Sequence, residues 1–291
     1  MKSAPKALVL GGHTGLLGQA LMDALARSSW RAIPLGRQDG QIQDVNFLAR
    51  TIKRIAPAVM FNTIAWTHVD LAEEYPAEAM SLNRGFVSSL VHSIKGTSIR
   101  LVQYSTDFVF NGAQQTPYTV EDAPKPESVY GVTKLAGEQA LGTLPPEQYC
   151  IVRTAWLFGP GRKNFVSTIL DACRKRDHID VVHDQTGSPT YTRDIAQWSL
   201  KLAELETCGI VHAVNGGEAS WCDLACEAVN LAETSCRVNP ISSAQWPQKA
   251  KRPHFSVLDT RRLTQATGIV PRPWPLALRE YLYREYLPLH S

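Results

Sequence analysis

The sequence has little of what marks membrane, secreted or nucleic-acid-binding proteins. No apolar run reaches the 18 residues that a membrane-spanning helix needs, and the run at 7–10 is too short for a signal peptide. The six cysteines are not spaced as a disulfide framework or a zinc site. With 30 basic and 27 acidic residues, the net charge is only +3 and there is no long basic run. We therefore expect a cytoplasmic protein with reduced thiols, no metal, and neither nucleic acid nor membrane as a partner.

Internal repeats and low-complexity tracts are also absent. The chain has 291 residues, of which 44% are hydrophobic, so it can bury a sizeable core in one large domain or two smaller ones. We expect a globular protein, and its mixed charges leave small charged metabolites open as ligands.

The first strong signal is a strand, a glycine turn and a helix near the N-terminus. The apolar run 7–10 enters the segment GGHTGLLG at 11–18, and leucines then recur at helical spacing. Gly12, Gly15 and Gly18 form the pattern G-x-x-G-x-x-G, which lets the backbone approach a pyrophosphate at a helix N-terminus. A glycine turn without a ligand is the alternative, but the strand and helix around it favour a dinucleotide site.

The end of the second expected strand bears on the choice between NADPH and NADH. An NAD site usually carries an acidic residue there for the ribose 2′-hydroxyl, whereas this chain has Arg37. A guanidinium suits a 2′-phosphate, so NADPH is slightly favoured. Arg37 can equally be a solvated turn residue, and the nearby Asp39 leaves the choice open.

Short apolar runs separated by helical patterns predict an α/β fold, a Rossmann-type doubly wound parallel sheet with a smaller C-terminal substrate-binding α/β domain. We expect an NAD(P)-binding domain at 1–157, with a returning segment near 190–215, and a mainly substrate-binding domain at 158–291. The expected strands are 7–10, 32–35, 58–64, 100–104, 150–158 and 210–214; the expected helices are 47–55, 77–94, 165–176, 194–205, 221–232 and 276–286; 184–190 is expected to be a polar loop.

Candidate catalytic side chains follow two of these elements. Tyr130 and Lys134 are four residues apart at the expected start of a helix, so they share one face, and the lysine can favour the phenolate. Ser105, Thr106 and Asp107 follow the strand 100–104, where a hydroxyl can orient a carbonyl oxygen toward the phenol. The sequence does not decide between Ser105 and Thr106. An exposed tyrosine and a capped turn are the plainer interpretations.

Trp156 and Gln185 are the candidate substrate contacts of the second half. An indole can lie on a pyranose or a nucleobase, and an amide can reach ring hydroxyls or carbonyls. Trp156 is equally compatible with a place in the core, where large aromatic side chains are common.

The ordered motifs of the chain resemble those of the extended short-chain dehydrogenase/reductases, and among them the dTDP-4-dehydrorhamnose reductase family. The matching segments are the glycine turn, 62–70, Ser105–Phe110, the YGxTKxxGE motif at 130–138, 153–156, 164–165, 184–190 and Arg252-Pro253. The resemblance implies that Tyr130 is the proton donor and that Lys134 lowers its pKa and holds the nicotinamide ribose. It also implies that Thr106, and not Ser105, orients the 4-keto oxygen of the sugar.

The resemblance further implies a nucleotide-sugar substrate, NADPH or NADH as cofactor, and reduction of dTDP-4-dehydrorhamnose to dTDP-L-rhamnose. The implied and motif-based cofactor contacts are Gly12, Gly15, Leu16, Leu17, Gly18, Arg37, Asp44, Val45, Ala65, Trp66, Thr67, Tyr130 and Lys134; the substrate contacts are Thr106, Asp107, Trp156 and Gln185. Another nucleotide-sugar reductase or epimerase is an alternative. So is a non-catalytic NADP-binding subunit, like the regulatory subunit of methionine adenosyltransferase.

Three positions depart from the family pattern. Some members dimerise through a magnesium ion held by glutamates, and here those positions carry Ala20 and Arg193. Neither side chain can ligate magnesium as a carboxylate does. We therefore expect a monomer or a homodimer without the magnesium bridge. Trp66 also stands where a smaller ring is expected, beside the nicotinamide.

Overall fold

The computed structural model describes residues 4–289 and is built on a six-stranded, fully parallel sheet. The strand order is β10-β5-β4-β3-β1-β2. The chain adds β2 on one side of β1 and then β3 on the other side, and this switch in the order of strands confirms the Rossmann-type fold. The strands are β1 (Lys6–Leu10), β2 (Arg31–Leu35), β3 (Val59–Asn62), β4 (Arg100–Thr106), β5 (Tyr149–Thr154) and β10 (Gly209–His212).

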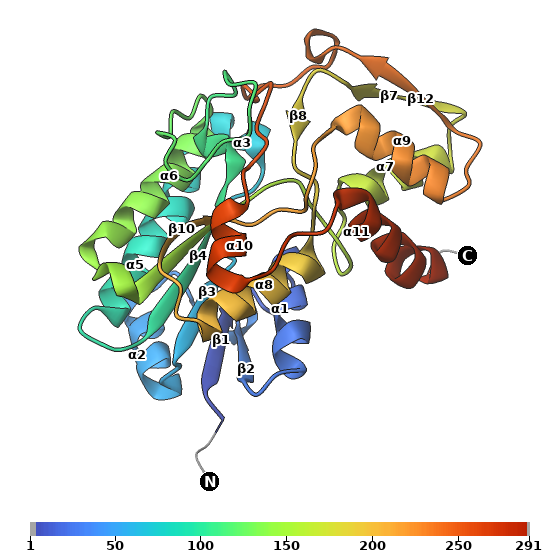
Figure 1. The fold of residues 1–291 in the computed structure, drawn as a ribbon. Coiled ribbons are helices and arrows are strands. Elements are labelled where there is room, and N and C mark those ends of the chain that lie inside the picture. The colour runs from blue at the N-terminus through green and yellow to red at the C-terminus, as the bar shows by residue number, and fades with distance from the viewer. Residues whose placement is uncertain (1–3, 290–291) are drawn as a thin grey trace.

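Helices cover both faces of this sheet (Figure 1). On one face lie α1 (Leu16–Ala26), α8 (Thr192–Glu204) and α10 (Arg261–Thr267); on the other lie α2 (Val45–Ile55), α5 (Phe86–Ile94) and α6 (Val129–Ala140). Alternate side chains of β1 enter opposite cores, Ala7 and Val9 on the first face and Leu8 and Leu10 on the second. Burial on both faces explains why these strands read as continuous apolar runs.

The helix expected at 77–94 is interrupted. After α3 (Val69–Glu74), α4 (Pro76–Met80) passes into a single π-helical turn at Ser81–Gly85 before α5 begins. Such turns are uncommon and often lie at functional sites.

A smaller C-terminal unit lies beside the carboxyl ends of the strands (Figure 1). In it, β7 (His178–Val182) pairs in parallel with β12 (Arg237–Ile241), and both pack against α7 (Phe165–Cys173) and α9 (Trp221–Leu231). A second cluster there includes α11 (Trp274–Tyr281) and the π-helical turn Leu282–Tyr286. The short 3-10 helices of the chain are Arg37–Asp39, Asp107–Val109, Leu141–Thr143, Pro146–Gln148, Ser243–Gln245 and Leu287–Leu289.

Two expected segments differ from the structure. The strand expected at 150–158 ends at Thr154, and Trp156 adopts φ 47, so the chain leaves the sheet and forms β6 (Leu157–Phe158) beside β9 (Thr190–Tyr191). The segment 184–190 is not a simple polar loop, because it contains β8 (Thr186–Gly187), which pairs with β11 (Ala219–Ser220). Its polar side chains Ser188 and Thr190 are buried and hydrogen-bonded to the backbone, Ser188 Oγ accepting the Leu258 amide at 3.3 Å and Thr190 Oγ1 donating to the Ser188 carbonyl at 3.0 Å.

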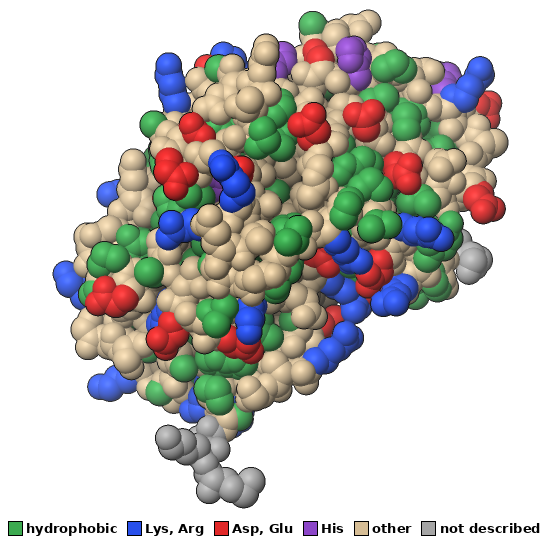
Figure 2. Space-filling model, viewed as in Figure 1, with side chains coloured by type: hydrophobic (Ala, Val, Ile, Leu, Met, Phe, Trp, Pro, Cys, Tyr) green, Lys and Arg blue, Asp and Glu red, His purple; other side chains and the backbone are tan. Residues whose placement is uncertain are grey.

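Two observations concern the surface charge and the length of the helices. On the face drawn in Figure 2, acidic and basic side chains are interspersed. Within residues 4–289, no helix combines the length and the apolarity needed to cross a bilayer.

Candidate active site

The glycine turn places the start of α1 against the end of β1. Gly11 has φ 84, and its amide donates to the Leu35 carbonyl at 2.8 Å, which joins the turn to β2. A Cβ on Gly18 would lie 2.3 Å from the Gly11 carbonyl oxygen, so helix and turn approach too closely for any side chain there. Gly15 caps α1 without a side-chain hydrogen bond, so the first-turn amides keep no capping partner. This cradle fits a dinucleotide pyrophosphate. Gly11 was missed by the sequence motif.

Two polar side chains, His13 and Asp39, meet at the end of β2, where Arg37 also lies. Arg37 begins a 3-10 turn and is exposed. Asp39, two residues on, accepts the Gly36 amide at 2.8 Å and lies 2.6 Å from Nε2 of His13. The acidic residue that made the cofactor ambiguous is therefore engaged by the glycine turn, which local sequence does not reveal.

The remaining expected cofactor contacts lie on two further segments. Asp44 caps α2 by accepting the Phe47 amide at 2.6 Å, and Val45 is the exposed first residue of that helix. The loop at 65–67 follows β3 and is held by Asn83, whose side chain accepts the Trp66 amide at 2.8 Å and donates to the Trp66 carbonyl at 3.2 Å.

Asn83 also joins this loop to the helix that carries Tyr130. Its Nδ2 donates to Oγ1 of Thr133 on α6 at 2.9 Å, and its side chain is 2% exposed. It stands in the π-helical turn that interrupts the expected helix. Sequence analysis missed it, because nothing in the local pattern marks this asparagine.

Tyr130 lies in the first turn of α6, which Ser128 caps by accepting the Gly131 amide at 3.1 Å. A Cβ on Gly131 would be 2.2 Å from the Phe108 carbonyl oxygen, so only glycine lets α6 approach the turn after β4 this closely. The Phe108 ring meets the Tyr130 ring edge-on at 5.5 Å. This approach brings the phenol within hydrogen-bonding reach of Thr106.

Thr106, and not Ser105, faces the phenol. Its hydroxyl donates to Oδ1 of Asp107 at 3.0 Å and accepts the Phe108 amide at 3.2 Å, and it lies close enough to Tyr130 to influence the pKa of the phenol. Ser105 Oγ is buried without a partner among residues 4–289. The geometry thus separates two hydroxyls that the bare sequence could not rank.

Burial dominates the electrostatics of this cluster. It raises the pKa of Tyr130 to about 12, against the lowering effect of the Thr106 hydrogen bond. It lowers the pKa of Lys134 to about 8, against the raising effect of Glu138. Lys134 Nζ donates to the Tyr104 carbonyl at 2.7 Å. Desolvation is thus the largest influence on the pKa of the phenol, and the expectation that Lys134 lowers that pKa stays a prediction.

Asp107 is a second buried acid beside the phenol. Burial raises its pKa to about 6, while hydrogen bonds from Ser256 and Thr106 act in the opposite direction. The Ser256 hydroxyl donates to Oδ2 of Asp107 at 2.6 Å and belongs to a segment that the sequence did not connect with the site. That segment continues toward the C-terminal unit, where the backbone amide of Ser256 donates to the Thr186 carbonyl at 2.8 Å.

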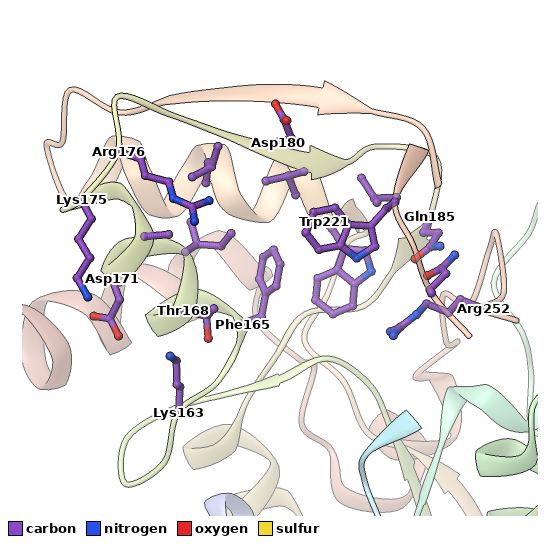
Figure 3. Close-up of a pocket in the computed structure, with 17 residues that line it drawn as sticks. Lys163, Phe165, Thr168, Asp171, Lys175, Arg176, Asp180, Gln185, Trp221 and Arg252 are labelled. Carbon is purple, nitrogen blue, oxygen red and sulfur yellow. The ribbon is translucent and has the colours of Figure 1, made fainter. Parts of the chain in front are cut away.

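The C-terminal unit contains a cavity of about 680 Å³ (Figure 3). Gln185, Trp221 and Arg252 lie together at one side of it, and Lys163, Asp171 and Lys175 lie on the other (Figure 3). Gln185 is only 4% exposed and directly precedes Thr186, so the cavity adjoins the segment that reaches Asp107. The cavity and the catalytic cluster are therefore neighbouring parts of one region.

Trp156 supports this cavity from behind. Its ring stacks on Trp221 with centroids 3.5 Å apart and planes 3° from parallel. The ring also lies so close to Gly187 that a Cβ on that residue would clash with it. Trp221 lines the cavity, whereas Trp156 is not among the lining residues. Sequence analysis missed Trp221, which reads as an ordinary aromatic residue at the start of a helix.

The two positions that depart from the magnesium-binding pattern are accounted for in other ways. Arg193 pairs with Glu285 at 2.5 Å, and Ala20 is buried on α1 in the core shared with α8. Among residues 4–289, no group of three or more histidine, cysteine or acidic side chains is placed to hold a metal ion.

Fold and geometry together define a Rossmann-type α/β protein with a dinucleotide cradle at the end of β1 and a Thr106–Tyr130–Lys134 cluster formed by the end of β4 and helix α6. Residues 6–287 match the family described as RmlD substrate binding domain, and the chain belongs to that family. The membership that the ordered motifs predicted is confirmed.

Named relatives span nearly the whole chain. It is 38% identical to a dTDP-4-dehydrorhamnose reductase of Streptomyces griseus, over 95% of this chain and 92% of that protein. It is 35% identical to a dTDP-4-keto-6-deoxy-D-glucose reductase of Streptomyces niveus, over 92% and 94%. A crystal structure of dTDP-4-dehydrorhamnose reductase from Bacillus anthracis, in complex with NADP, matches with a TM-score of 0.91 at 30% identity, over 97% and 99%.

Proposed function

We propose that this protein is an oxidoreductase that uses NADPH or NADH to reduce the 4-keto group of a nucleotide-linked 6-deoxy sugar, converting dTDP-4-dehydrorhamnose to dTDP-L-rhamnose. The observation that carries the proposal is the Tyr130 phenol beside Thr106 and Asp107, next to a glycine cradle built for a dinucleotide. The relatives, which are named as reductases of such sugars, support the same reaction.

When bound, the nicotinamide supplies the hydride that reaches C4 of the sugar. When the keto sugar binds, the Thr106 hydroxyl turns from Asp107 and donates to the carbonyl oxygen, and Tyr130 delivers a proton to that oxygen as it becomes an alkoxide. Because burial raises the pKa of Tyr130 to about 12, the phenol is protonated at neutral pH and ready to act as the acid. Lys134 has its ammonium fixed by the Tyr104 carbonyl, which leaves other N–H donors for the nicotinamide ribose.

We assign cofactor binding to the residues around the glycine cradle, the end of β2, the α2 cap, and the loop after β3. They are Gly12, Gly15, Leu16, Leu17, Gly18, Arg37, Asp44, Val45, Ala65, Trp66, Thr67, Tyr130 and Lys134. The open α1 N-terminus and the glycines at its start support the pyrophosphate part of this assignment. We place the cofactor domain at 1–157 with the returning segment 190–215, and the substrate domain mainly at 158–291.

We propose that the cavity of the C-terminal unit receives the nucleotide of the substrate. Trp221 offers an aromatic face, Gln185 an amide, and Arg252 a cation, and Lys163 and Lys175 add positive charge opposite (Figure 3). Such a set suits a base and a diphosphate. The sugar would then extend toward Thr106 and Asp107. Trp156 contributes by stacking behind Trp221.

We further propose that any dimer of this chain forms without a magnesium bridge. Arg193 already pairs with Glu285, and Ala20 offers no ligand oxygen. Sedimentation with magnesium and with a chelator should give the same mass, and a dimer found only with magnesium would contradict the proposal.

The decisive experiment replaces Tyr130 by Phe and follows cofactor oxidation with dTDP-4-dehydrorhamnose. Loss of the acid should lower kcat by about 10²- to 10⁴-fold while NADPH still binds. The control is Val132→Ala, an exposed change on the same helix, which should keep kcat within about twofold. Near-normal kcat in Tyr130→Phe would remove the tyrosine from its role. Tight cofactor binding without turnover in the parent protein would support the non-catalytic alternative.

A second candidate differs in stereochemistry. The Streptomyces niveus relative is named for the reduction of a different 4-keto-6-deoxy sugar, and that sugar is therefore a second candidate substrate for this chain. NMR analysis of the product from each keto sugar separates the candidates, and the substrate with the higher kcat/KM is the better assignment.

A further inference from the structure

The end of β2 holds an interaction that local sequence does not show. Nε2 of His13, a residue of the glycine turn, lies 2.6 Å from Oδ2 of Asp39. The same oxygen accepts the Gly36 amide at 2.8 Å. A Cβ on Gly36 would lie 3.2 Å from His13 Cδ2, so the imidazole packs directly against the strand end. Asp39 is therefore held in place by two segments that meet at the expected ribose site.

This strand end decides which dinucleotide a Rossmann fold prefers. A free carboxylate there accepts a hydrogen bond from the ribose 2′-hydroxyl of NADH, whereas a cation favours the 2′-phosphate of NADPH. Here Arg37 and Asp39 stand two residues apart, so the sequence points both ways. If Asp39 were free, it would repel a 2′-phosphate at short range.

The structure removes the ambiguity through His13. Oδ2 of Asp39 already has two donors, the imidazole of His13 and the Gly36 amide. Arg37 is exposed, and among residues 4–289 no hydrogen bond or ion pair engages its side chain. The available cation at this site is therefore the guanidinium, and the anion beside it is already partnered.

We propose that His13 sets the cofactor preference: by holding Asp39, it lets Arg37 favour NADPH over NADH. This inference rests on the dinucleotide site of the proposed function and adds a specificity-determining residue to it. His13 acts largely through Asp39, so removing the histidine should matter only while the carboxylate is present.

The test is a double-mutant cycle read by equilibrium binding, with fluorescence titration of NADPH and NADH. The parent should bind NADPH more tightly. His13→Ala should free Asp39 and shift the ratio of the two Kd values toward NADH by about tenfold or more, because NADPH binding weakens and NADH binding gains. Asp39→Asn should preserve or strengthen the NADPH preference. In the double variant, the histidine change should shift the ratio by only about twofold.

Two further variants complete the design. Arg37→Ala should weaken NADPH binding and leave NADH almost unchanged, whereas Gln38→Ala, an exposed change in the same turn, should leave both Kd values unchanged. Equal loss of both cofactors in His13→Ala, or full additivity in the cycle, would overturn the inference. NADPH binding without turnover of the keto sugar would contradict the proposed reaction and leave this inference standing.

Discussion

Lys134 shows how burial adjusts one side chain for its place in the site. Desolvation lowers its pKa to about 8, with Glu138 opposing, and its Nζ donates to the Tyr104 carbonyl at 2.7 Å. Tyr130, one turn earlier, has a pKa raised to about 12 by the same burial. On moderate alkalinisation the lysine therefore loses its charge before the tyrosine loses its proton.

The first prediction concerns NADPH binding as the pH is raised. Deprotonation of Lys134 turns a charge-assisted hydrogen bond to the ribose into a neutral one, so the affinity of the free protein should fall about fivefold as the pH rises through about 8. Titrations across that range test this. Lys134→Met should bind weakly throughout and lack the step, while the exposed Lys95→Met should keep it. A step that persists without Lys134 would assign the titration to another group.

At the scale of elements, the π-helical turn at 81–85 places one asparagine between two parts of the site. Asn83 bonds the backbone of Trp66 in the loop after β3, and also the hydroxyl of Thr133 on α6. The loop expected to hold the cofactor and the helix that carries Tyr130 thus share one anchor. A regular α-helix would turn this side chain in another direction.

Asn83→Ala should disturb binding and chemistry together. It leaves buried partners of Trp66 and Thr133 unsatisfied, at a cost of about 1–3 kcal/mol for each group left without a partner. We expect a higher KM for NADPH and a lower kcat, with far-UV circular dichroism unchanged. Ser81→Ala, an exposed change in the same turn, is the control. Equal kinetics in the two variants would show that the anchor has no role in positioning.

His212, on the edge strand β10, is a buried base outside the catalytic cluster. Its side chain is fully buried, and Nδ1 lies 3.1 Å from the Tyr118 carbonyl. Burial, and next the charge of Arg153, lower the pKa of His212 to about 3, while Asp259 acts in the opposite direction. The folded protein therefore excludes a proton that the unfolded chain binds below about pH 6.5.

The consequence is a loss of stability in acid. Below the unfolded pKa of about 6.5 the unfolded state gains a proton and the folded state does not, so His212 should cost about 2 kcal/mol between pH 7 and pH 5. Asp107, whose raised pKa of about 6 acts in the opposite direction, makes a variant comparison necessary. Urea unfolding at both pH values should show a smaller loss in His212→Gln. An identical loss in both proteins would assign the acid sensitivity elsewhere.

Local patterns predicted the parts of the fold and site that depend on local chemistry. Three such patterns each predict the local structure from a few neighbouring residues. They are the apolar run of β1, the glycine spacing of the turn, and the Tyr130–Lys134 spacing. The order of motifs along the chain then predicted the family. Membership and sheet were therefore available from the sequence.

The missed features depend on partners distant in the chain. The pairing of β7 with β12 joins segments more than fifty residues apart. In addition, Pro240 lies within β12, and a proline inside a segment argues against a strand when only the sequence is known. The left-handed conformation of Trp156 is imposed where the chain leaves the sheet beside β9. Trp221 and the His13–Asp39 pair likewise become meaningful only when other segments meet them.

At the scale of the whole molecule, one short segment ties the sheet to the C-terminal unit. The backbone amides of Lys249 and Ala250 and the guanidinium of Arg252 all donate to the Asp70 carboxylate, at 3.1, 3.0 and 2.8 Å. Against the raising effect of burial, these groups lower the pKa of Asp70. The attachment lies where the loop after β3 enters α3, and Arg252 also lines the cavity.

Asp70 should therefore control substrate capture more than cofactor binding. In Asp70→Ala, the segment loses three hydrogen bonds at once, so Arg252 is no longer fixed at the cavity and the KM for the nucleotide sugar should rise about tenfold or more. The Kd for NADPH should change by less than about twofold, because the cradle at α1 does not use this carboxylate.

Glu127→Gln is the matched control, since Glu127 makes a single exposed ion pair with Lys251 in the same segment. Exposed pairs contribute about 0–1 kcal/mol, so its KM should stay close to that of the parent. Steady-state kinetics with both substrates and direct NADPH titration separate the two effects. If Asp70→Ala weakened both ligands equally, the attachment would serve general stability; a selective rise in sugar KM shows that docking of this segment completes the nucleotide cavity.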